Sequence, residues 1–473
     1  MAKTFRDFLA QIQAMGKEEY LEFTKPVDPR FEATTLVRKL ELEGRQPLVM
    51  FQNPLDLNAQ PSQYPLCINV FSTRKKLALA LGLDPDAYKM ELPFALMKRY
   101  QNRIPPITVD RTEAVVKERV FRGAEVDLSK FPIPTHHSLD GAPYILAGTM
   151  VTKNRDSGNY NLGMIRFHVQ DKNTLVVNAQ PKHHSGMIIK QYKDAGEKTP
   201  FAIALGCHPA FYLGSCWEGK FDTEEYELAG GVLEEPVRLV PSETWGEDFM
   251  VPADAEIIIE GEVDPEELLQ EGPLGEFTKY YKTICGGVVK PQYFPKCNVT
   301  AVTTRKDAYF QSLFIGHSEH GLLGAIPKEA VIYERVSAVS PGLKAVHLTP
   351  GGTCRHVCYL SLKQRTYGEA QDAIMAAFTG DWHIKFVVAV DEDVDIYNDT
   401  EVIWAISSRT QPSRDYFVIP NAMGGALDPT VDSDKPYTSK MGIDATKPFG
   451  EPFPEVCEVP LDLLGSMHIE DYL

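Results

Sequence analysis

Hydrophobic positions in the first quarter of the chain follow two different spacings. Four apolar side chains near the N-terminus recur at three- and four-residue intervals, namely Phe5, Phe8, Leu9 and Ile12. This spacing predicts a helix over residues 4–25. Continuous apolar runs at 47–52 and 65–71 predict buried strands, and residues 72–82 predict a second helix with Ser72 as its cap. We therefore expect a mixed α/β domain here.

The middle of the chain contains many short apolar runs between about residues 115 and 305. Glycine, proline and aspartate separate these runs, and valine is frequent within them. The pattern favours a β-barrel or sandwich over parallel β-α-β units, because a sheet with few helices must close on itself or pack on a second sheet. One helix is expected inside this region, from Asp264 to about Gln270.

The last third returns to alternating helix and strand patterns. The expected elements are a helix at 328–340, a strand at 354–362, a helix at 368–378, and strands at 384–393 and 401–407. Residues 410–473 are rich in proline and glycine and show little periodicity. We divide the chain into an N-terminal α/β domain (1–112), a central β domain (113–310) and a C-terminal α/β domain (311–473).

Composition and charge narrow the range of functions. The 473 residues exceed what one hydrophobic core usually organises, which agrees with two or three domains. With 48 Lys and Arg against 65 Asp and Glu, the net charge of −17 disfavours nucleic-acid binding. No apolar run approaches the roughly 20 residues that span a bilayer, and the N-terminus lacks a secretory signal. We therefore expect a cytoplasmic protein with no membrane partner, whose eight scattered cysteines are free thiols.

The first candidate for chemistry is the loop Glu271-Gly-Pro-Leu-Gly-Glu276. Two carboxylates in one pocket can separate their pKa values, so that one stays ionised while the other holds a proton. An acid–base step needs such a pair. The alternative is a turn that carries two solvated glutamates.

A second candidate is the segment Asn161-Leu-Gly-Met-Ile-Arg166. On a regular strand, side chains five positions apart point to opposite faces, so both can reach one site only if the strand twists or bulges. Gly163 would permit such a bulge. An inward arginine needs an anion, which could be a substrate carboxylate, a phosphate or a glutamate. A structural Arg–Glu pair remains the alternative.

Metal-ligating residues are suggested by two further segments. The loop from Gln180 to Gly186 contains the adjacent histidines His183 and His184, of which at most one is expected to bind a given metal. Glu243 lies in the segment Ser-Glu-Thr-Trp. Asn161, one of the two histidines and Glu243 would together suit a hard divalent cation. The alternative for the histidine loop is an exposed polar loop.

Several common motifs are missing from the sequence. No G-x-G-x-x-G follows a predicted strand, and there is no Walker A, G-x-S-x-G or H-E-x-x-H motif. Their absence disfavours a dehydrogenase, a nucleoside triphosphatase, a serine hydrolase and a zinc protease.

Taken in order, these motifs resemble the UbiD family of prenylated-FMN-dependent reversible decarboxylases. The resemblance extends from about residue 5 to residue 450. Besides the segments above it includes Phe131-Pro-Ile-Pro134, Asp140-Gly-Ala-Pro-Tyr144, Asp393-Val-Asp-Ile-Tyr397, Pro412-Ser-Arg-Asp415, Leu427-Asp-Pro429 and Gly442-Ile-Asp-Ala-Thr446. It implies an α/β domain, a split β-barrel of the flavin-reductase kind, and a second α/β domain with an oligomerising tail. Homodimers or larger homo-oligomers are usual in the family.

The resemblance also implies a set of cofactors. The family binds prenylated FMN, supplied by a flavin prenyltransferase, through Mn²⁺ or Mg²⁺ on the flavin phosphate, often with K⁺ nearby. The implied metal ligands are Asn161, His184 and Glu243. Beside Asn161, Arg166, His184 and Glu243, the implied flavin contacts are Met164, Ile165, Gln180, Lys182, His183, Ser185 and Gly186.

The implied reaction is the non-oxidative, reversible decarboxylation of an aromatic or heteroaromatic carboxylic acid. The substrate would form a covalent adduct with prenylated FMN, and CO₂ would leave as its electrons enter the flavin. Glu276 would donate the replacing proton, while Glu271 and Arg166 tune its pKa. His317 and His320 stand where many relatives carry prolines, and could contact substrate or lie at the surface.

Two other functions remain open at this point. A split barrel could hold ordinary FMN in an FMN-dependent oxidoreductase, although hydride transfer does not require a Glu–Arg–Glu set. The chain could also be a non-catalytic assembly subunit that has kept the fold, although Arg166, Glu271 and Glu276 are all present.

Overall fold

The computed structural model describes residues 3–425, 427–431 and 437–473. The N-terminal elements are α1 (Phe5–Ala14), β1 (Tyr20–Phe23), α2 (Glu32–Leu42), β2 (Leu48–Phe51), β3 (Leu66–Ile68), α3 (Arg74–Ala80) and α4 (Glu91–Gln101). The three strands form a sheet in the order β1-β2-β3-β18, where β18 (Phe310–Gln311) returns from much later in the chain. The strands predicted at 47–52 and 65–71 are confirmed as β2 and β3.

Two details of the predicted N-terminal helices are corrected. The helix predicted over 4–25 ends at Ala14, because Gly16 takes a left-handed φ of 93° and the chain then continues into β1. The helix predicted at 72–82 is confirmed as α3. Its cap is Thr73, whose side chain accepts a hydrogen bond from the backbone N–H three residues later, whereas Ser72 donates to backbone carbonyls.

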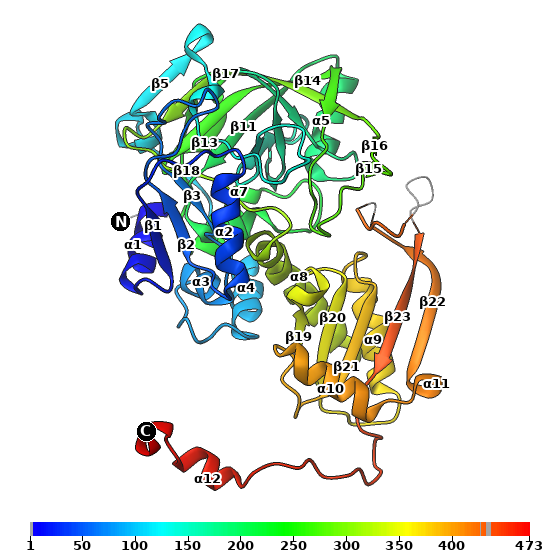
Figure 1. Cartoon of the computed structure of the whole chain (residues 1–473). Coiled ribbons are helices and arrows are strands. Elements are labelled where there is room, and N and C mark those ends of the chain that lie inside the picture. Colours follow the sequence, from blue (N-terminus) through cyan, green and yellow to red (C-terminus); the bar gives the residue numbers. More distant parts are fainter. Residues whose placement is uncertain (1–2, 426, 432–436) are drawn as a thin grey trace.

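The central region is dominated by a nine-stranded sheet that curls into half of a barrel (Figure 1). Its strands are β5 (Arg119–Arg122), β6 (Tyr144–Ile145), β7 (Thr149–Lys153), β8 (Tyr160–Met164), β9 (Phe167–Val169), β10 (Thr174–Val177), β11 (Thr199–Leu205), β14 (Ile257–Glu271) and β17 (Gln292–Thr304). The order is β6-β9-β10-β17-β14-β11-β7-β8, and β5 adds to β17. The expectation of a β-rich middle region that curls on itself is confirmed at this level.

Several smaller elements accompany the curled sheet in this part of the chain. They are the helices α5 (His184–Asp194), α6 (Pro209–Ser215) and α7 (Glu225–Leu233), the sheet β13-β12-β4 of Gly246–Pro252, Arg238–Ser242 and Ile107–Thr108, and the hairpin β15 (Ile284–Cys285) and β16 (Val288–Val289). Helices α5 and α7 begin near β8, which matters for the site described below.

The helix predicted from Asp264 to Gln270 is wrong, since these residues belong to β14. The strand pairs with β17 as far as Glu271, and its register shifts between Asp264 and Leu268. The Asp264 carboxylate accepts hydrogen bonds from the two N–H groups that follow Pro265. That local pattern is typical of a helix start, but here it stabilises an irregularity within a strand.

The C-terminal part is a five-stranded α/β unit. It contains α8 (Ser318–Val339), β19 (Leu343–Leu348), β20 (Val357–Leu362), α9 (Glu369–Gly380), β21 (Phe386–Asp391), α10 (Asp399–Arg409), α11 (Pro412–Asp415), β22 (Tyr416–Met423), β23 (Tyr437–Asp444) and α12 (Leu461–Ser466). The sheet order is β19-β20-β21-β23-β22, and the pairs β20–β21 and β21–β23 are parallel. The strands at 354–362 and 384–393 and the helix at 368–378 are confirmed.

Three predictions in this part are corrected. Residues 401–407 form the middle of α10 rather than a strand, because Val402 and Ala405 face the core one helical turn apart while Trp404 is exposed. The helix predicted at 328–340 begins earlier, at Ser318, and continues through Pro327. The region with little periodicity contains β22, β23 and α12.

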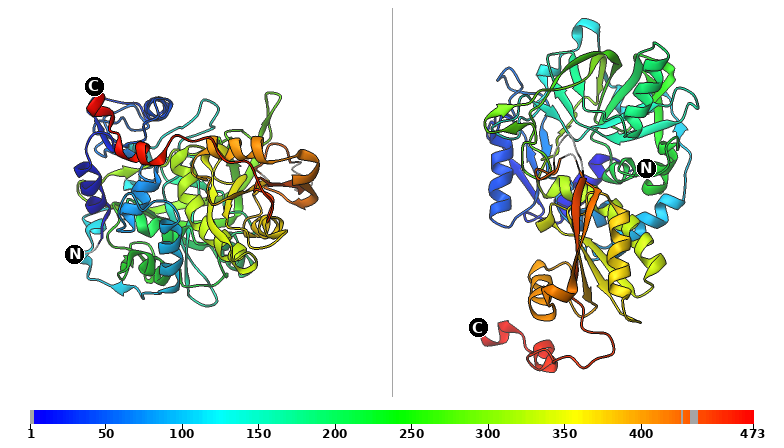
Figure 2. Two further views of the ribbon diagram at one scale, coloured as in Figure 1. Left: turned by 90° about the horizontal axis from the view of Figure 1, so that it is seen from below. Right: turned by 90° about the vertical axis from the view of Figure 1, so that its right-hand side faces the viewer.

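Helix α8 connects the two halves of the molecule. It packs against α4 on one side and against α9 and β19 on the other, and one hydrophobic core extends from the N-terminal sheet into the C-terminal unit. Figures 1 and 2 show the C-terminal sheet as a separate layer beside the curled sheet. The site described below lies where these two layers meet.

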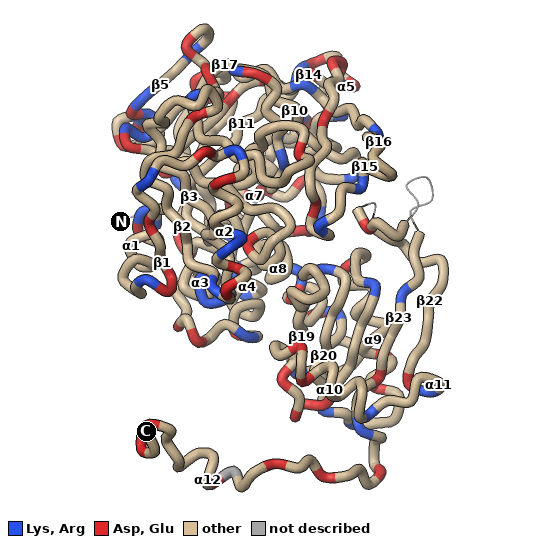
Figure 3. Tube along the Cα trace, in the orientation of Figure 1, with Lys and Arg blue, Asp and Glu red and all other residues tan. Residues whose placement is uncertain are grey.

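The chain ends in an extended tail, residues 448–473, that lies outside the packed layers (Figure 2). The tail carries aspartate and glutamate but no lysine or arginine, whereas elsewhere the two signs are interspersed (Figure 3). Within the described ranges, no helix combines the length and apolar character needed to cross a membrane.

Candidate active site

Glu271 is the most completely paired carboxylate of the site. It lies at the end of β14, its residue is 2% exposed, and it accepts two hydrogen bonds of 3.0 Å from the Nε and Nη2 atoms of Arg166. The Tyr144 hydroxyl and the Asn178 amide donate two more, also at 3.0 Å. Burial and the nearby Glu271 raise the pKa of Tyr144, so the phenol stays a donor. The four bonds hold the Glu271 carboxylate in place, and the two from Arg166 thereby position that guanidinium.

Glu276 approaches the same arginine from the loop that follows β14. Its carboxylate forms an ion pair with Nη1 of Arg166, and its residue is 6% exposed. The loop is held by Asp140, which accepts from the Gly275 N–H at 2.9 Å. A Cβ on Gly141 would lie 2.6 Å from the carbonyl oxygen of residue 272, so close packing requires glycine there. The predicted Glu–Arg–Glu arrangement is thus assembled in the structure.

The chain brings Asn161 and Arg166 to one region by interrupting the strand between them. Gly163 pairs in regular register with Met150, so the expected bulge does not lie there. Strand β8 ends at Met164 and β9 begins at Phe167. The break therefore falls at residues 165 and 166, and it resets the alternation that would place the two side chains on opposite faces.

A second polar cluster forms around the start of α5. The Asn161 amide donates to the Ser185 hydroxyl at 3.0 Å, which leaves its carbonyl oxygen as an acceptor. Nδ1 of His184 lies 3.3 Å from Oε1 of Glu225, whose other oxygen accepts from the Leu162 N–H at 2.6 Å. Amide, imidazole and carboxylate groups thus gather from β8, α5 and α7.

Electrostatics in this second cluster are governed by burial. Burial raises the pKa of the Glu225 carboxyl above its ordinary value, although His184 acts against this shift. The hydrogen bond to Glu225 raises the pKa of His184 in turn. Because a buried carboxylate with a single imidazole partner lacks a full counter-charge, the cluster suits a cation.

Glu243, the third predicted metal ligand, has a different set of partners. It pairs with Arg111, with Arg122 and, at 3.2 Å, with the buried Nζ atom of Lys117. Burial raises its pKa, but the ion pairs with Arg111 and Lys117 outweigh burial and hold the pKa below its ordinary value. In the described part of the chain, no recorded contact joins Glu243 to Asn161 or His184, and its partners are three cations.

Sequence reasoning missed Glu225 although a signal for it exists. The segment from Glu225 to Leu233 is apolar apart from two glutamates, and a short helix of that composition is expected to be buried on most faces. A glutamate at its first position is then a buried carboxylate that needs a partner. Across the described residues, no group of three or more His, Cys, Asp and Glu side chains forms a metal cluster.

The other predicted flavin contacts surround these two clusters. Gln180 donates to the Asn178 side chain at 3.0 Å and so connects the histidine loop to Glu271. Ser185 and Gly186 are buried in the first turn of α5, and Met164 and Ile165 border the strand break. His183 precedes α5. The Nζ atom of Lys182 lies 3.8 Å above the ring of Trp382 in the C-terminal unit.

The two histidines at the start of α8 differ in their surroundings. Nδ1 of His317 lies 2.6 Å from the Glu41 carboxylate, and its ring stacks on Phe314. Nδ1 of His320 accepts from the Gly316 N–H at 3.3 Å. Since both side chains have specific partners in the interior, neither is simply a solvated surface residue.

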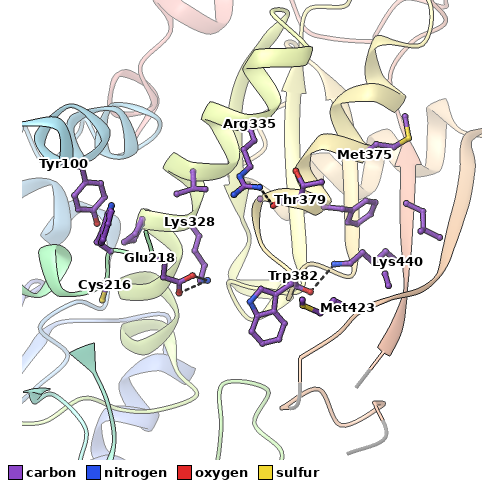
Figure 4. Close-up of a pocket in the computed structure, with 17 residues that line it drawn as sticks. Tyr100, Cys216, Glu218, Lys328, Arg335, Met375, Thr379, Trp382, Met423 and Lys440 are labelled. Carbon is purple, nitrogen blue, oxygen red and sulfur yellow. Dashed lines mark hydrogen bonds and ion pairs between the residues drawn. The ribbon is translucent and has the colours of Figure 1, made fainter. Parts of the chain in front are cut away.

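A cavity of 630 Å³ lies between α8, α9, β22 and the segment after α6 (Figure 4). Lys328 crosses it and pairs with Glu218 at 3.0 Å and with Asp381 at 2.9 Å. Its described lining contains none of the predicted site residues, but it includes Trp382, the contact of Lys182. The cavity is therefore adjacent to the candidate site without forming part of it.

Comparison with known families supports this arrangement. Models for the N-terminal, Rift-related and C-terminal domains of 3-octaprenyl-4-hydroxybenzoate carboxy-lyase match residues 14–92, 107–318 and 321–445. The chain belongs to the UbiD family of carboxy-lyases and is a decarboxylase of that family. The sequence alone had left two other functions open, an FMN-dependent oxidoreductase and a non-catalytic subunit, and membership of this family now takes their place.

Individual relatives resemble the chain over nearly its whole length. Anhydromevalonate phosphate decarboxylase of Methanosarcina mazei is 32% identical over 447 residues, which cover 94% of this chain and 96% of the relative. The UbiD-class enzyme HmfF from Pelotomaculum thermopropionicum, solved with FMN, is 34% identical with a TM-score of 0.90, covering 99% of this chain and 100% of its own. An evolved dimeric form of HmfF was solved with prFMN. The apo 3,4-dihydroxybenzoic acid decarboxylase from Enterobacter cloacae is 26% identical with a TM-score of 0.86, covering 98% and 99% of the two chains.

Proposed function

We propose that this protein decarboxylates an aromatic or heteroaromatic carboxylic acid reversibly and without net oxidation, using bound prenylated FMN. The observation that carries the proposal is Arg166 held between the carboxylates of Glu271 and Glu276. Similar solved enzymes contain FMN or prFMN, which supports the choice of cofactor. When bound, the modified flavin supplies a sink for the electron pair that remains as CO₂ departs.

The two glutamates have different capacities for proton transfer. Glu271 accepts four hydrogen bonds, which occupy both of its carboxylate oxygens. In the described part of the chain, the carboxylate of Glu276 has Arg166 as its recorded partner, which leaves one oxygen available. We therefore assign to Glu276 the delivery of the proton that replaces CO₂, and to Arg166 the orientation of that carboxyl.

The residues of the second cluster fit the metal that the family uses. Asn161, His184 and Glu225 would hold Mn²⁺ or Mg²⁺, because a hard divalent cation accepts carboxylate and amide oxygens together with an imidazole. We replace Glu243 by Glu225 in this set. The first turn of α5 would add backbone N–H groups toward the flavin phosphate. A K⁺ ion stays part of the proposal without assigned ligands.

The substrate class has a second candidate. Two curated relatives are named for a phosphorylated acid, anhydromevalonate phosphate, and both are 32% identical to this chain. A phosphorylated unsaturated acid therefore stands beside the aromatic acids, for which the dihydroxybenzoic acid decarboxylase provides the comparison. The direct test is to assay both classes with enzyme produced alongside a flavin prenyltransferase. Enzyme produced without that partner is expected to be inactive.

The role of Glu276 is tested by Glu276→Gln. This variant is expected to lose decarboxylation while it keeps its flavin absorbance, because the amide cannot donate the acidic proton. Glu267→Gln is the matched control, since Glu267 lies on β14, the strand before the loop of Glu276, and pairs at 3.0 Å with Lys296 at the surface. Wild-type turnover in Glu276→Gln would remove it as the proton donor.

The tail supports the expected self-association. Its exposed apolar side chains include Val456, Val459, Leu464, Met467, Ile469 and Leu473. Such a density of apolar groups in solvent is typical of a segment that packs on a partner, and we propose that the partner is a second copy. Removal of residues 448–473 is expected to lower the oligomeric state measured by light scattering; an unchanged mass would reject this role.

A further inference from the structure

Lys440 is a buried cation whose recorded hydrogen-bond partners are uncharged (Figure 4). It lies on β23, its residue is 5% exposed, and its Nζ atom donates to the backbone carbonyls of Trp382 at 3.0 Å and Ile384 at 2.6 Å. An ammonium group has three donors, so these two bonds leave one donor unused. Within the described ranges Lys440 forms no ion pair. Burial lowers its pKa to about 8 although Asp381 acts in the opposite direction, and a negative group beside it would restore the charged form.

The cavity beside Lys440 carries more positive than negative charge. In the described part of its lining there are three cations, Lys328, Arg335 and Lys440, and one carboxylate, Glu218. Asp381 pairs with Lys328 at 2.9 Å and so adds a second carboxylate nearby. Of the two cations that have no recorded carboxylate partner in the described ranges, Arg335 is exposed to water and Lys440 is buried. One buried positive charge therefore lacks a matching negative charge, which is costly unless an anion binds.

Most of the remaining lining of this cavity is apolar. Its large side chains include Trp217, Val331, Phe378, Trp382, Ile419 and Met423. The ring centroid of Phe378 lies 5.4 Å from Nζ of Lys440, so the apolar surface adjoins the unmatched charge. The volume of 630 Å³ falls within the range of about 300–1,000 Å³ that is usual for small-molecule sites. A ligand with an apolar body and one negative group would satisfy both features.

The walls of the cavity come from both halves of the molecule. Trp217 and Glu218 follow α6 in the central region, whereas Trp382 and Lys440 belong to the C-terminal unit. The ring of Trp382 also lies 3.8 Å from Nζ of Lys182, which belongs to the histidine loop. A ligand in the cavity would therefore contact both halves and would lie one side chain away from that loop.

We infer that this cavity binds a small amphipathic anion, with its apolar body against Trp217, Trp382 and Phe378 and its negative group at Lys440. The site is separate from the proposed decarboxylation site, because the described lining contains none of the residues assigned to the flavin, the metal or proton transfer. Aromatic acids and fatty acids share the required chemistry, and competition between the two distinguishes them. The ligand would hold the two halves of the molecule together from a position outside the reaction centre.

The test measures binding to flavin-loaded enzyme, so the cofactor site is filled and turnover is not needed. The fluorescent amphipathic anion 8-anilinonaphthalene-1-sulfonate is titrated first, and 2-naphthoate and laurate then compete with it. Saturable binding with energy transfer from tryptophan is expected, because two of the four tryptophans, Trp217 and Trp382, line the cavity. Lys440→Met should weaken binding roughly 10- to 100-fold, since it removes a charge-assisted hydrogen bond. Ala422→Phe, which fills the cavity and keeps its charges, should also prevent binding.

Lys76→Met is the matched control for loss of a buried lysine. Lys76 lies on α3, burial lowers its pKa to about 8 as well, and it lies outside the described lining of the cavity. This variant should keep the affinity of wild type. Competition by 2-naphthoate or by laurate would support the inference and identify the kind of acid. Equal affinity in Lys440→Met and wild type, or unchanged binding in Ala422→Phe, would overturn it. Binding that occurs in flavin-free protein and disappears on flavin loading would also overturn it, because the cavity would then belong to the cofactor site.

Discussion

Two buried glutamates, Glu225 and Glu243, have similar exposure and opposite surroundings. Their side chains are 3% and 2% exposed. Glu243 pairs with Lys117 and with two arginines, whereas Glu225 contacts one imidazole and one backbone N–H. The positive charge beside Glu243 exceeds its own negative charge. Beside Glu225, the positive charge is smaller than the negative charge of the carboxylate.

This difference determines which carboxylate can bind a metal. A divalent cation next to Glu243 would meet three fixed cations within ion-pair distance, and their repulsion would offset the attraction of one carboxylate. Next to Glu225, a divalent cation would supply the missing charge. The opposite directions of the two pKa shifts, lowered for Glu243 and raised for Glu225, express the same contrast.

The largest effect is expected from Glu225→Gln. Loss of this carboxylate is expected to weaken Mn²⁺ binding by about 100-fold or more, since even outer-shell partners of metal ligands are worth 10- to 100-fold. Flavin retention should fall with the metal if the metal holds its phosphate. Metal titration and the flavin absorbance of the purified protein measure the two losses separately.

Glu243→Gln is the matched control for that experiment. It makes the same chemical change at a carboxylate with the same exposure, and it is expected to keep its Mn²⁺ affinity. If Glu243→Gln lost the metal while Glu225→Gln kept it, the ligand set first predicted from the sequence would be right and the one proposed from the structure would be wrong.

A smaller effect is expected on folding stability, and here Glu243→Gln should have the larger effect of the two substitutions. Glu243→Gln should lower the free energy of unfolding by about 2 kcal/mol, because it leaves Lys117 buried with Glu260 as its remaining carboxylate. The estimate is below the usual cost of breaking a buried pair, since Arg111 and Arg122 are half-exposed and water screens them. Urea unfolding of both variants measures it; a stability loss confined to Glu225→Gln would contradict the comparison.

Much of the fold could be predicted because the local pattern and the final environment agree. The runs that became β2, β3, β20 and β21 are apolar and bounded by turn residues, and they are buried strands in the structure. The prediction failed where one local sequence pattern is compatible with two different conformations. Asp264 and Pro265 suggested a helix start, but pairing with β17 decided the conformation, and this pairing is not visible in nearby residues.

The residues of the candidate site also differ in whether nearby sequence could predict them. The spacing along the chain indicated Arg166 and the pair Glu271 and Glu276 as separate candidates, and the resemblance to the UbiD family placed the three together. The metal set could not, because Asn161, His184 and Glu225 come from three elements and the choice between glutamates depends on cations distant in sequence. Lys117 and Arg122 precede Glu243 by more than 100 residues. Spacing along the chain therefore could not show that Glu243 was already neutralised.

The smallest effect is expected from pH and salt, and it tests the electrostatic basis of the comparison. Because ion pairs lower the pKa of Glu243, its stabilising contribution should be complete above the ordinary value of about 4.5 and should disappear as the pH falls through its lower folded value. The difference in unfolding free energy between wild type and Glu243→Gln should therefore stay constant from pH 8 to about pH 5 and shrink on further acidification.

High salt should reduce the same difference, because Arg111 and Arg122 are 52% and 59% exposed and mobile ions can screen them. Lys117 is buried, so part of the difference should survive in 1 M salt. A difference that stayed at full size both at pH 3 and in high salt would mean that Glu243 stabilises the fold through packing and hydrogen bonding rather than through charge. In that case the surplus of cations around Glu243 would no longer explain why the metal is assigned to Glu225.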